Sequence, residues 1–364
     1  MTNTAFYSEY KVWFLPVLRR KNIIAEMKKI FSTLTICVAL ASVSTAQDPN
    51  FSQFFASPLT LNPALTGKFD GVYRFAINYR NQWPSISNAY TTGTASLDMG
   101  ILKNSIPEYD QFGIGIMGFT DRAGNGAIVS NYMALSLAYH KALDENGYHQ
   151  IGAGFQGSYT NKRLDVSSLK FGDQLTANGF TGLSAENFNG YKFGLSYFDL
   201  NAGLFYNGTT NGYNNYYAGV SMYHLNRHKE VFSDTGRYNL ASRTTLQAGG
   251  KVPAGTYNYF HFAANHSIQA KAHNTMIGAA YSLNVNNSEE NPTNVYLGCW
   301  YRMNDAIIPY VGLEFGEFHV GASYDVNTSS LKPASNSRGG VEISMIFIRK
   351  YTDPSMKKLN CPKF

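Results

Sequence analysis

The stretch NYRNQWPSIS, residues 78–87, bears most directly on the fold because it ends a run of alternating side chains. From Tyr73 the odd positions are aromatic or aliphatic as far as Trp83, apart from Asn81, whereas the even positions are mostly polar or cationic. Side chains two apart on a strand share a face, so this strand has one apolar and one polar face. Aromatic rings near both ends of the apolar face are typical of membrane-crossing strands. A soluble β-sandwich shows similar alternation, so this strand alone leaves both interpretations open.

The composition of the 364-residue chain favours short strands, tight turns and aromatic belts. Only 15% of the residues are charged, below the quarter or so that is typical of soluble domains. Another 15% are aromatic, with 26 Tyr and 24 Phe. The formal net charge is +6, and Lys and Arg are scattered rather than gathered into a basic stripe. We therefore expect no nucleic acid among the partners.

The beginning of the sequence predicts export. After Met27, two lysines precede an apolar stretch and then small residues that end at Ala46. This is the pattern of a secretory signal peptide over residues 27–46, with cleavage expected after Ala46. The apolar stretch is too short for a stable transmembrane helix, which needs about 20 residues. Residues 1–26 lack this pattern, and we expect them to be a mis-annotated extension upstream of the true start.

Alternating runs of about ten residues recur through the rest of the chain, and no later stretch has the 18 consecutive apolar residues of a transmembrane helix. We expect about fourteen antiparallel strands, an even number, that close into an all-β outer-membrane barrel. The predicted strands are 69–83, 90–100, 111–120, 130–140, 149–160, 196–206, 215–224, 243–252, 257–267, 274–284, 294–303, 306–315, 317–326 and 339–349.

The lengths of the links between these strands support the barrel. When both termini of such a barrel lie in the periplasm, links after odd-numbered strands are extracellular and on average longer. The three longest predicted links, 161–195, 225–242 and 327–338, all follow odd-numbered strands. The sequence therefore predicts long extracellular loops on one side of the membrane.

The mature chain divides into three predicted parts. Residues 47–68 contain several Phe and Leu side chains and are expected to form a lead-in segment that can fold into the lumen as a plug. Residues 69–349 form the barrel, and the basic residues 350–364 form a periplasmic tail.

Two matches to the dinucleotide fingerprint G-x-G-x-x-G, at 113–118 and 152–157, do not predict a nucleotide site. The fingerprint binds a pyrophosphate at a strand-to-helix turn, whereas both copies lie inside alternating strands, where small inward residues leave lumen space or let another element approach. The eight His, Cys299 and Cys361 lack metal or disulfide spacing. We expect no catalytic residue, metal or cofactor, although a lipid-modifying Ser/His pair remains an alternative.

Several motifs together make the chain resemble one family, the PorP/SprF proteins of the type IX secretion system and gliding machinery of Bacteroidetes. The resemblance covers essentially the whole mature chain. The motifs are QDPNFSQFFASPLTLNPALTG from Gln47, YRNQWPSI from Tyr79, DRAGNG from Asp121, LDVSSLKFGDQ from Leu164, YFDLNAGLFYN from Tyr197, SYDVNTSSL from Ser323 and CPKF from Cys361.

The resemblance implies a non-enzymatic outer-membrane protein. Some family members support export together with outer-membrane and periplasmic ring components of the secretion system. Others hold the C-terminal sorting domain of one secreted cargo protein at the cell surface. Motif residues for which we expect structural or family-specific roles are Asn62, Pro63, Gly67, Arg80, Gln82, Trp83, Asp121 and Gly124. Candidate partner-binding residues in the long links are Phe180, Phe188, Tyr191, Phe232 and Tyr238.

The opening stretch is then expected to be the outer end of the first barrel strand. Trp83 should lie at the lipid interface, while Arg80 and Gln82 turn inward. For Arg80 we expect a lumen acid such as Asp98 or Glu342 as partner, or a hydrogen bond to the plug, with direct contact to a partner protein as the alternative.

The competing functional class is a pore or transporter for small or hydrophobic solutes. Fourteen strands enclose a sufficient lumen, but the inward faces show no hydrophobic stripe that would mark a lipid route. A barrel that only shapes the membrane is a third possibility, and outer-membrane lipid is an expected partner in every case.

Overall fold

The computed structural model describes most of the chain from residue 48 onward. The described ranges are 48–86, 90–102, 105–124, 126–189, 192–230, 238–288 and 292–351. The predicted extension 1–26, the predicted signal peptide 27–46 and the tail beyond Tyr351 lie outside the described residues.

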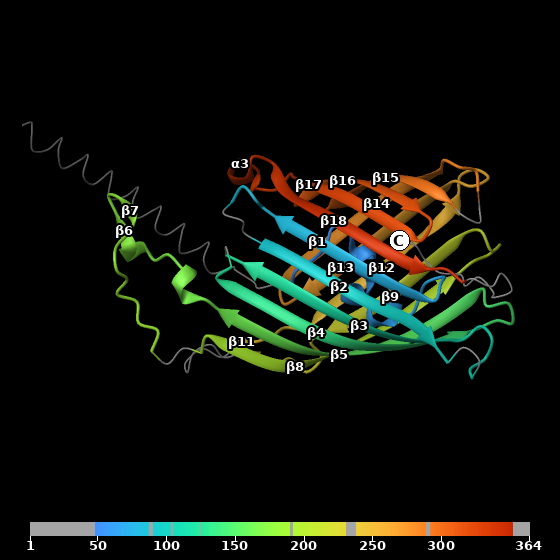
Figure 1. Cartoon of the computed structure of the whole chain (residues 1–364), viewed down its shortest axis with the longest axis horizontal. Coiled ribbons are helices and arrows are strands. Elements are labelled where there is room, and N and C mark those ends of the chain that lie inside the picture. The colour runs from blue at the N-terminus through green and yellow to red at the C-terminus, as the bar shows by residue number, and fades with distance from the viewer. Residues whose placement is uncertain are drawn as a thin grey trace, which may run out of the picture. The chain divides into compact units, whose positions relative to one another are not determined.

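Fourteen antiparallel strands close into a single barrel, which confirms the predicted fold (Figure 1). Each strand pairs with the next barrel strand along the chain, and the first and last pair along the whole of β1, from Tyr73 opposite Arg349 to Gln82 opposite Gly340. The barrel strands are β1 (Tyr73–Gln82), β2 (Tyr90–Ile101), β3 (Gln111–Ala123), β4 (Ile128–Ala142), β5 (His149–Leu164), β8 (Gly194–Gly208), β9 (Asn215–Tyr223), β12 (Arg243–Pro253), β13 (Tyr259–Gln269), β14 (Ala272–Asn284), β15 (Thr293–Arg302), β16 (Ala306–Phe315), β17 (Phe318–Asn327) and β18 (Arg338–Arg349).

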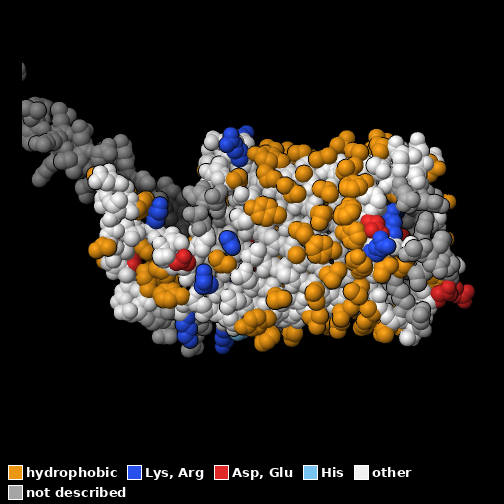
Figure 2. Space-filling view, viewed as in Figure 1, with side chains coloured by type: hydrophobic (Ala, Val, Ile, Leu, Met, Phe, Trp, Pro, Cys, Tyr) orange, Lys and Arg blue, Asp and Glu red, His pale blue; other side chains and the backbone are white. Residues whose placement is uncertain are grey.

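The two faces of the strands differ as the alternation predicts. Outward side chains are large, apolar and exposed, including Met133 at 74% and Phe155 at 68%. Inward side chains on the same strands are buried and mostly polar, such as Ser136 and Gln156. Hydrophobic side chains spread over the outer surface of the barrel in Figure 2. This is the inverse of a soluble protein and suits a barrel surrounded by lipid.

The links at the two ends of the barrel have different lengths. One end, the long-loop rim, includes the three longest links, 165–193, 224–242 and 328–337, so the predicted grouping of long links is confirmed. The other end is the short-turn rim. Outer-membrane barrels have their longer loops outside the cell, so the long-loop rim is the extracellular one.

Short elements in these long links were not predicted. They are the hairpins β6 (Leu175–Thr176) with β7 (Gly179–Phe180) and β10 (Lys229–Glu230) with β11 (Tyr238–Asn239), the 3₁₀ turns η3 (Val166–Ser168) and η4 (Gly172–Gln174), and α3 (Lys332–Ser335). Within the described part of the chain, no helix has the length and apolar character needed to cross a membrane.

Candidate functional site: the lumen segment and its contacts

Residues 48–68, here called the lumen segment, lie among the inward side chains of the barrel. The segment contains η1 (Phe54–Ala56), α2 (Pro58–Leu61) and η2 (Pro63–Leu65). Pro58 and Pro63 each begin a helix, the position where proline's fixed φ and missing N–H are tolerated. The Asn62 side chain caps η2 by accepting a hydrogen bond from the Ala64 N–H at 2.9 Å.

The lumen segment runs from the long-loop rim to the short-turn rim. Asp48 contacts Gln269 at the end of β13, which is the long-loop end of that strand. Gly67, near the other end of the segment, donates its N–H to Asp98 of β2 at 2.7 Å. Its φ of +71° suits glycine, and the chain continues from there into β1. The segment thus spans the lumen before the first strand begins.

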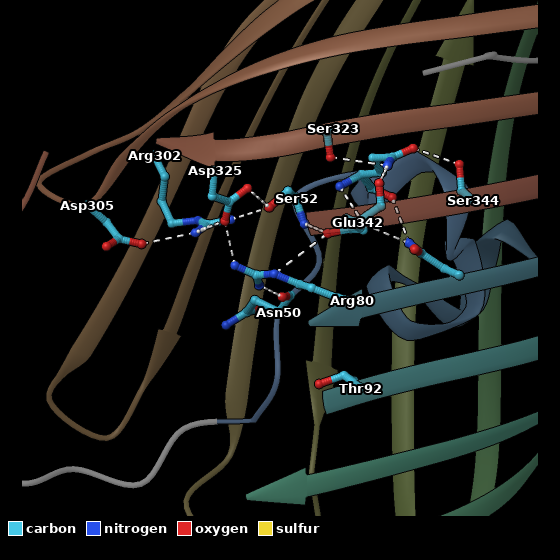
Figure 3. Close-up of polar contacts among 12 residues, drawn as sticks. Asn50, Ser52, Arg80, Thr92, Arg302, Asp305, Ser323, Asp325, Glu342 and Ser344 are labelled. Atoms are coloured by element: carbon cyan, nitrogen blue, oxygen red, sulfur yellow. Dashed lines mark hydrogen bonds and ion pairs between the residues drawn. The ribbon is translucent and has the colours of Figure 1, made fainter. Parts of the chain in front are cut away.

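A network of buried charges binds residues 50–53 of the lumen segment (Figure 3). Arg80 of β1 donates to Asp325 of β17 at 2.7 Å, lies 3.7 Å from Glu342 of β18, and donates to the backbone carbonyl of Asn50. Arg302 of β15 donates to the same Asp325 carboxylate at 2.9 Å. All four charged side chains are almost fully buried, so each charge requires its partners. We call Arg80, Arg302, Asp325 and Glu342 the Arg80 cluster.

The backbone of the lumen segment is part of this network. The two carboxylate oxygens of Glu342 accept the N–H groups of Ser52 and Gln53 at 2.7 and 2.8 Å. The Ser52 hydroxyl donates to Asp325 at 2.7 Å. The Gln53 side chain donates to the Glu342 carbonyl at 2.9 Å and accepts from Ser344 at 2.6 Å. Three motifs distant in sequence, around FSQF, YRNQW and SYDVN, therefore meet at one place.

Arg80 has a lumen acid, Glu342, beside it and a hydrogen bond to the lumen segment, as expected, but Asp98 is not its partner. Asp98 forms a bidentate pair with Arg74 instead, at 3.0 and 2.8 Å. Strand register is the reason, because Arg74 lies opposite Asp98 on β2, whereas Arg80 lies opposite Thr92 on β2 and opposite Glu342 on β18.

Asn62 anchors the middle of the segment to strands on the far side of the lumen. Its side-chain amide donates to the Leu204 carbonyl of β8 at 3.1 Å. Inward glycines leave room for this approach. A Cβ on Gly154 of β5 would overlap Pro63, and one on Gly113 of β3 would overlap Thr66. Gly113 and Gly115 of the first G-x-G-x-x-G match and Gly154 of the second therefore let the lumen segment approach, one of the two roles expected for these glycines, whereas Gly118 and Gly157 meet nothing within 4 Å.

The first described residue, Asp48, is fixed at the long-loop rim by charged neighbours. Its carboxylate lies 2.8 Å from His224, which also bonds to Asp199, and 3.5 Å from Arg243. Burial alone lowers the pKa of His224, but the attraction of Asp48 and the hydrogen bonds to both carboxylates outweigh it and raise the pKa to about 9. Burial alone raises the pKa of Asp48, yet His224 and Arg243 hold it well below its ordinary value. The start of the segment is thus held by charges.

An apolar surface inside the barrel corrects one expectation, because the inward faces of β13–β16 are not free of a hydrophobic stripe. The rings of Trp300 and Tyr310 lie 5.6 and 5.4 Å from that of Phe55. The sequence hides this stripe because inward and outward faces of these strands are both apolar. The buried inward residues are Ala263, Met276, Ala280, Tyr296, Trp300, Ala306, Ile308 and Tyr310, and Phe54, Phe55 and Leu61 of the lumen segment pack against them.

The remaining motif residues lie at the long-loop rim. Gln82 is the last residue of β1, and the Trp83 N–H donates to the Gly339 carbonyl at 2.7 Å. The half-buried Trp83 ring lies edge-on to Tyr90 at 5.5 Å. Asp121 accepts a hydrogen bond from Thr92 at 2.6 Å, and Gly124, with φ of +60°, begins the turn after β3. These residues shape the rim and do not join the Arg80 cluster.

The structure describes the side chains of two of the five candidate aromatic residues of the long links, Phe180 and Phe188. Phe180 of β7 is 49% exposed and lies under the Lys170 ammonium. Phe188 is half-buried and lies 5.5 Å from Phe171. Tyr238 pairs with Glu230 through its backbone. Tyr191 and Phe232 lie outside the described residues, as does the side chain of Tyr238.

Among the residues that the structure describes, no group of three or more His, Cys, Asp or Glu side chains is arranged to hold a metal ion. The buried charges of the lumen are instead bound to one another and to the lumen segment. The fold and this interior define a class, an outer-membrane β-barrel whose lumen is crossed by its own N-terminal segment.

The family follows from sequence comparison. Residues 43–347 match the model of the type IX secretion system membrane protein PorP/SprF. The chain belongs to this family and is an outer-membrane component of type IX secretion. No curated protein matches the chain.

Solved structures with a similar fold are outer-membrane proteins of low sequence identity. CdiB from Acinetobacter baumannii is 7% identical with a TM-score of 0.40, and the match covers 76% of this chain and 59% of CdiB. The Pseudomonas putida toluene transporter TodX is 10% identical with a TM-score of 0.44, covering 83% and 94%. A Pseudomonas aeruginosa FadL homologue is 10% identical with a TM-score of 0.43, covering 79% and 92%. At these identities nothing about substrate or partner follows.

Proposed function

We propose that the protein is a closed anchor of the type IX secretion system, which binds the C-terminal sorting domain of a secreted protein at its long-loop rim. The observation that carries this proposal is the lumen segment, which contacts strands around the barrel from β1 to β18 and fills the interior. A barrel filled in this way suits binding better than conduction. We propose no enzymatic step, because the charged side chains of the Arg80 cluster are engaged with one another and with the lumen segment.

The long link 165–193 offers a surface for a protein partner. Leu183 is 97% exposed and Leu175 is 60% exposed, together with Phe180. These side chains belong to a link on the long-loop rim and not to the strands of the barrel wall. Contact with lipid therefore does not account for their exposure. Apolar and aromatic residues of this kind form the cores of protein interfaces. The β6–β7 hairpin also has strand edges to which a partner can add a strand.

The test is crosslinking on intact cells, followed by gentle solubilisation, capture of the tagged protein and identification of crosslinked peptides by mass spectrometry. We expect crosslinks from 165–193 or 224–242 to the C-terminal domain of one secreted protein. Crosslinks only from the short-turn rim or the tail to periplasmic ring components would instead support a general role in the secretion apparatus and overturn the anchor.

The competing function, a pore, is tested separately. The inward apolar stripe on β13–β16 is covered by Phe54 and Phe55, so the closed anchor predicts little single-channel conductance in planar bilayers. Stable open channels from the purified protein would support transport and overturn a closed lumen.

A further inference from the structure

Two arginines stand on the outer surface of the barrel at the long-loop rim. Arg122 is the second-last residue of β3, and Arg163 is the second-last residue of β5. Both are exposed, and each follows a residue that turns inward, Asp121 toward Thr92 and Lys162 toward Glu230. Side chains alternate along a strand, so both guanidinium groups are directed outward, toward the surroundings of the barrel.

The register places the two arginines side by side. Val129 of β4 lies opposite Arg122 of β3 and also opposite Arg163 of β5. Neighbouring strands are 4.7–4.9 Å apart, so the two arginine backbones are separated by about 10 Å. Neither makes an ion pair with any residue that the structure describes. Asp165 is close in sequence to Arg163. Its carboxylate accepts hydrogen bonds from Ser167 and Ser168 at 2.6 and 3.1 Å, and these bonds together with the weaker attraction of Arg163 lower the pKa of Asp165.

Toward the middle of the membrane from the arginines, β4, β5 and the neighbouring β8 expose a wide apolar surface. Met133 of β4, Tyr159 of β5 and Phe198 of β8 are 74%, 46% and 73% exposed, and the rings of Tyr159 and Phe198 lie 5.0 Å apart. A shallow hollow beside Arg163 is also lined by Phe193. Figure 2 shows Lys and Arg side chains at the long-loop margin of the apolar surface. Two cations next to an apolar surface are suited to bind a ligand that has an anionic group and an apolar part.

At the short-turn rim, the cation on the outward face of these strands is paired with an acid. Lys141, on the outward face of β4 at the short-turn rim, lies 3.8 Å from the Asp110 carboxylate. The adjoining links contribute further acids, Glu108, Asp144 and Glu145. Among the described residues of this face, the exposed cations without an ion pair, Arg122 and Arg163, therefore lie at the long-loop rim, whereas Lys141 at the short-turn rim is paired.

We propose that the outward face of β3, β4, β5 and β8 binds a phosphorylated glycolipid of the outer leaflet. The guanidinium groups of Arg122 and Arg163 bind its phosphate groups, and its acyl chains lie along Met133, Tyr159 and Phe198. Arginine suits this role because its planar fork donates two hydrogen bonds to a phosphate and because it stays charged. The membrane itself supplies such a ligand to an outward surface at this height. The assignment does not depend on which protein partner the long loops bind.

The experiment compares lipid retention by the full-length protein and its variants in mild detergent. Wild type, Arg122→Gln/Arg163→Gln and Lys141→Gln are incubated with bis-phosphorylated lipid A or with dephosphorylated lipid A, and bound lipid is counted by native mass spectrometry. We expect wild type and Lys141→Gln to retain the phosphorylated lipid equally. Loss of two cations near an anionic lipid should weaken retention by roughly thirty-fold. Heat-dependent migration on gels checks that every variant is a folded barrel.

Four outcomes would overturn the proposal. The double variant could retain phosphorylated lipid as well as wild type does, or the dephosphorylated lipid could bind equally well. In a third outcome, millimolar inorganic pyrophosphate displaces the lipid completely and binds to wild type but not to the double variant. This result would assign the site to a soluble phosphate compound. A protein whose copurification requires both arginines, in place of lipid, would likewise reassign the surface.

Discussion

The guanidinium group of Arg80 lies 2.7 Å from the carboxylate of Asp325, although 245 positions separate the two residues in the chain. Arg80 belongs to β1 and Asp325 to β17, so the pair bridges over β18, the last strand. Inside the barrel, the junction between the first and last strands is therefore fastened by side chains as well as by the backbone ladder. Ser52 of the lumen segment bonds to the same carboxylate, which couples this junction to the occupied lumen.

Replacing Arg80 with Gln is expected to destabilise the barrel by about 3–5 kcal/mol, because it leaves buried carboxylates without one of their cations. Thermal unfolding of the purified variant in detergent measures the loss. The matched control is Arg349→Gln, which removes a half-exposed arginine 3.2 Å from Glu317 and should cost less than about 1 kcal/mol. Equal melting of the two variants would show that the Arg80 cluster is not needed for stability.

Gly154→Ala tests the close approach of the lumen segment to β5. The added Cβ overlaps the backbone at Pro63, so we expect a loss of about 1–3 kcal/mol. We also expect channel openings in planar bilayers as the segment is displaced. Gly157→Ala on the same strand is the control, because its Cβ meets nothing within 4 Å. A variant at Gly154 that remains as stable and as closed as wild type would contradict the observed packing.

The contact of His224 with Asp48 predicts a pH dependence on the alkaline side. The pKa of His224 is about 9 in the folded protein, above its ordinary value of 6.5, so folding favours the protonated form. Its contribution to stability is complete below about pH 6.5 and is lost as the pH rises through about 9. Asp48 has a pKa well below its ordinary value and stays ionised over this range.

Melting temperatures measured across this range should therefore fall with rising pH in wild type and fall less in His224→Gln. Asp199 also bonds to His224, so the single change removes both contacts of the imidazole. A parallel decline in the two proteins would assign the alkaline destabilisation to other groups.

The double variant Phe180→Ser/Leu183→Ser tests the proposed partner surface. Both side chains are exposed, so stability should change by no more than about 0.5 kcal/mol. Crosslinking to a secreted partner should fall at least tenfold, because exposed apolar residues at an interface centre contribute most of its binding energy. The control is Glu186→Gln in the same link. Undiminished crosslinking in the double variant would remove this surface from the anchor model.

The strands were predictable because each carries its own evidence in the alternation of side chains. Arg80 faces inward as its position between Tyr79 and Asn81 indicates, and the structure describes it there. The partners of Arg80 depend on the register between strands and on which strand follows the one next to β1. A local sequence pattern predicts neither of these. Asp98 is an acidic residue on the inward face, as predicted. It lies six positions along β2 from Thr92, the residue opposite Arg80, and is therefore too far along the strand to pair with it.

The interior stripe of Trp300 and Tyr310 was missed for a different reason. β15 and β16 are apolar on both faces, so alternation does not tell a lipid-facing ring from one that packs against Phe55. Arg302 was not predicted as a member of the cluster either. It lies at the end of a strand, where an arginine is expected to face solvent, and only the position of Asp325 shows that it is paired inside the barrel.

The lumen segment precedes β1 in the chain, yet Glu342 and Asp325, which bind its Ser52, belong to the last two strands. A chain that stops short of these strands leaves Arg80 with neither carboxylate and leaves the Ser52 and Gln53 amides without their acceptor. Ser52 and Gln53 therefore gain the acceptors of their amide groups only when the last two strands join the barrel, so closing the cylinder and fixing this part of its interior depend on each other.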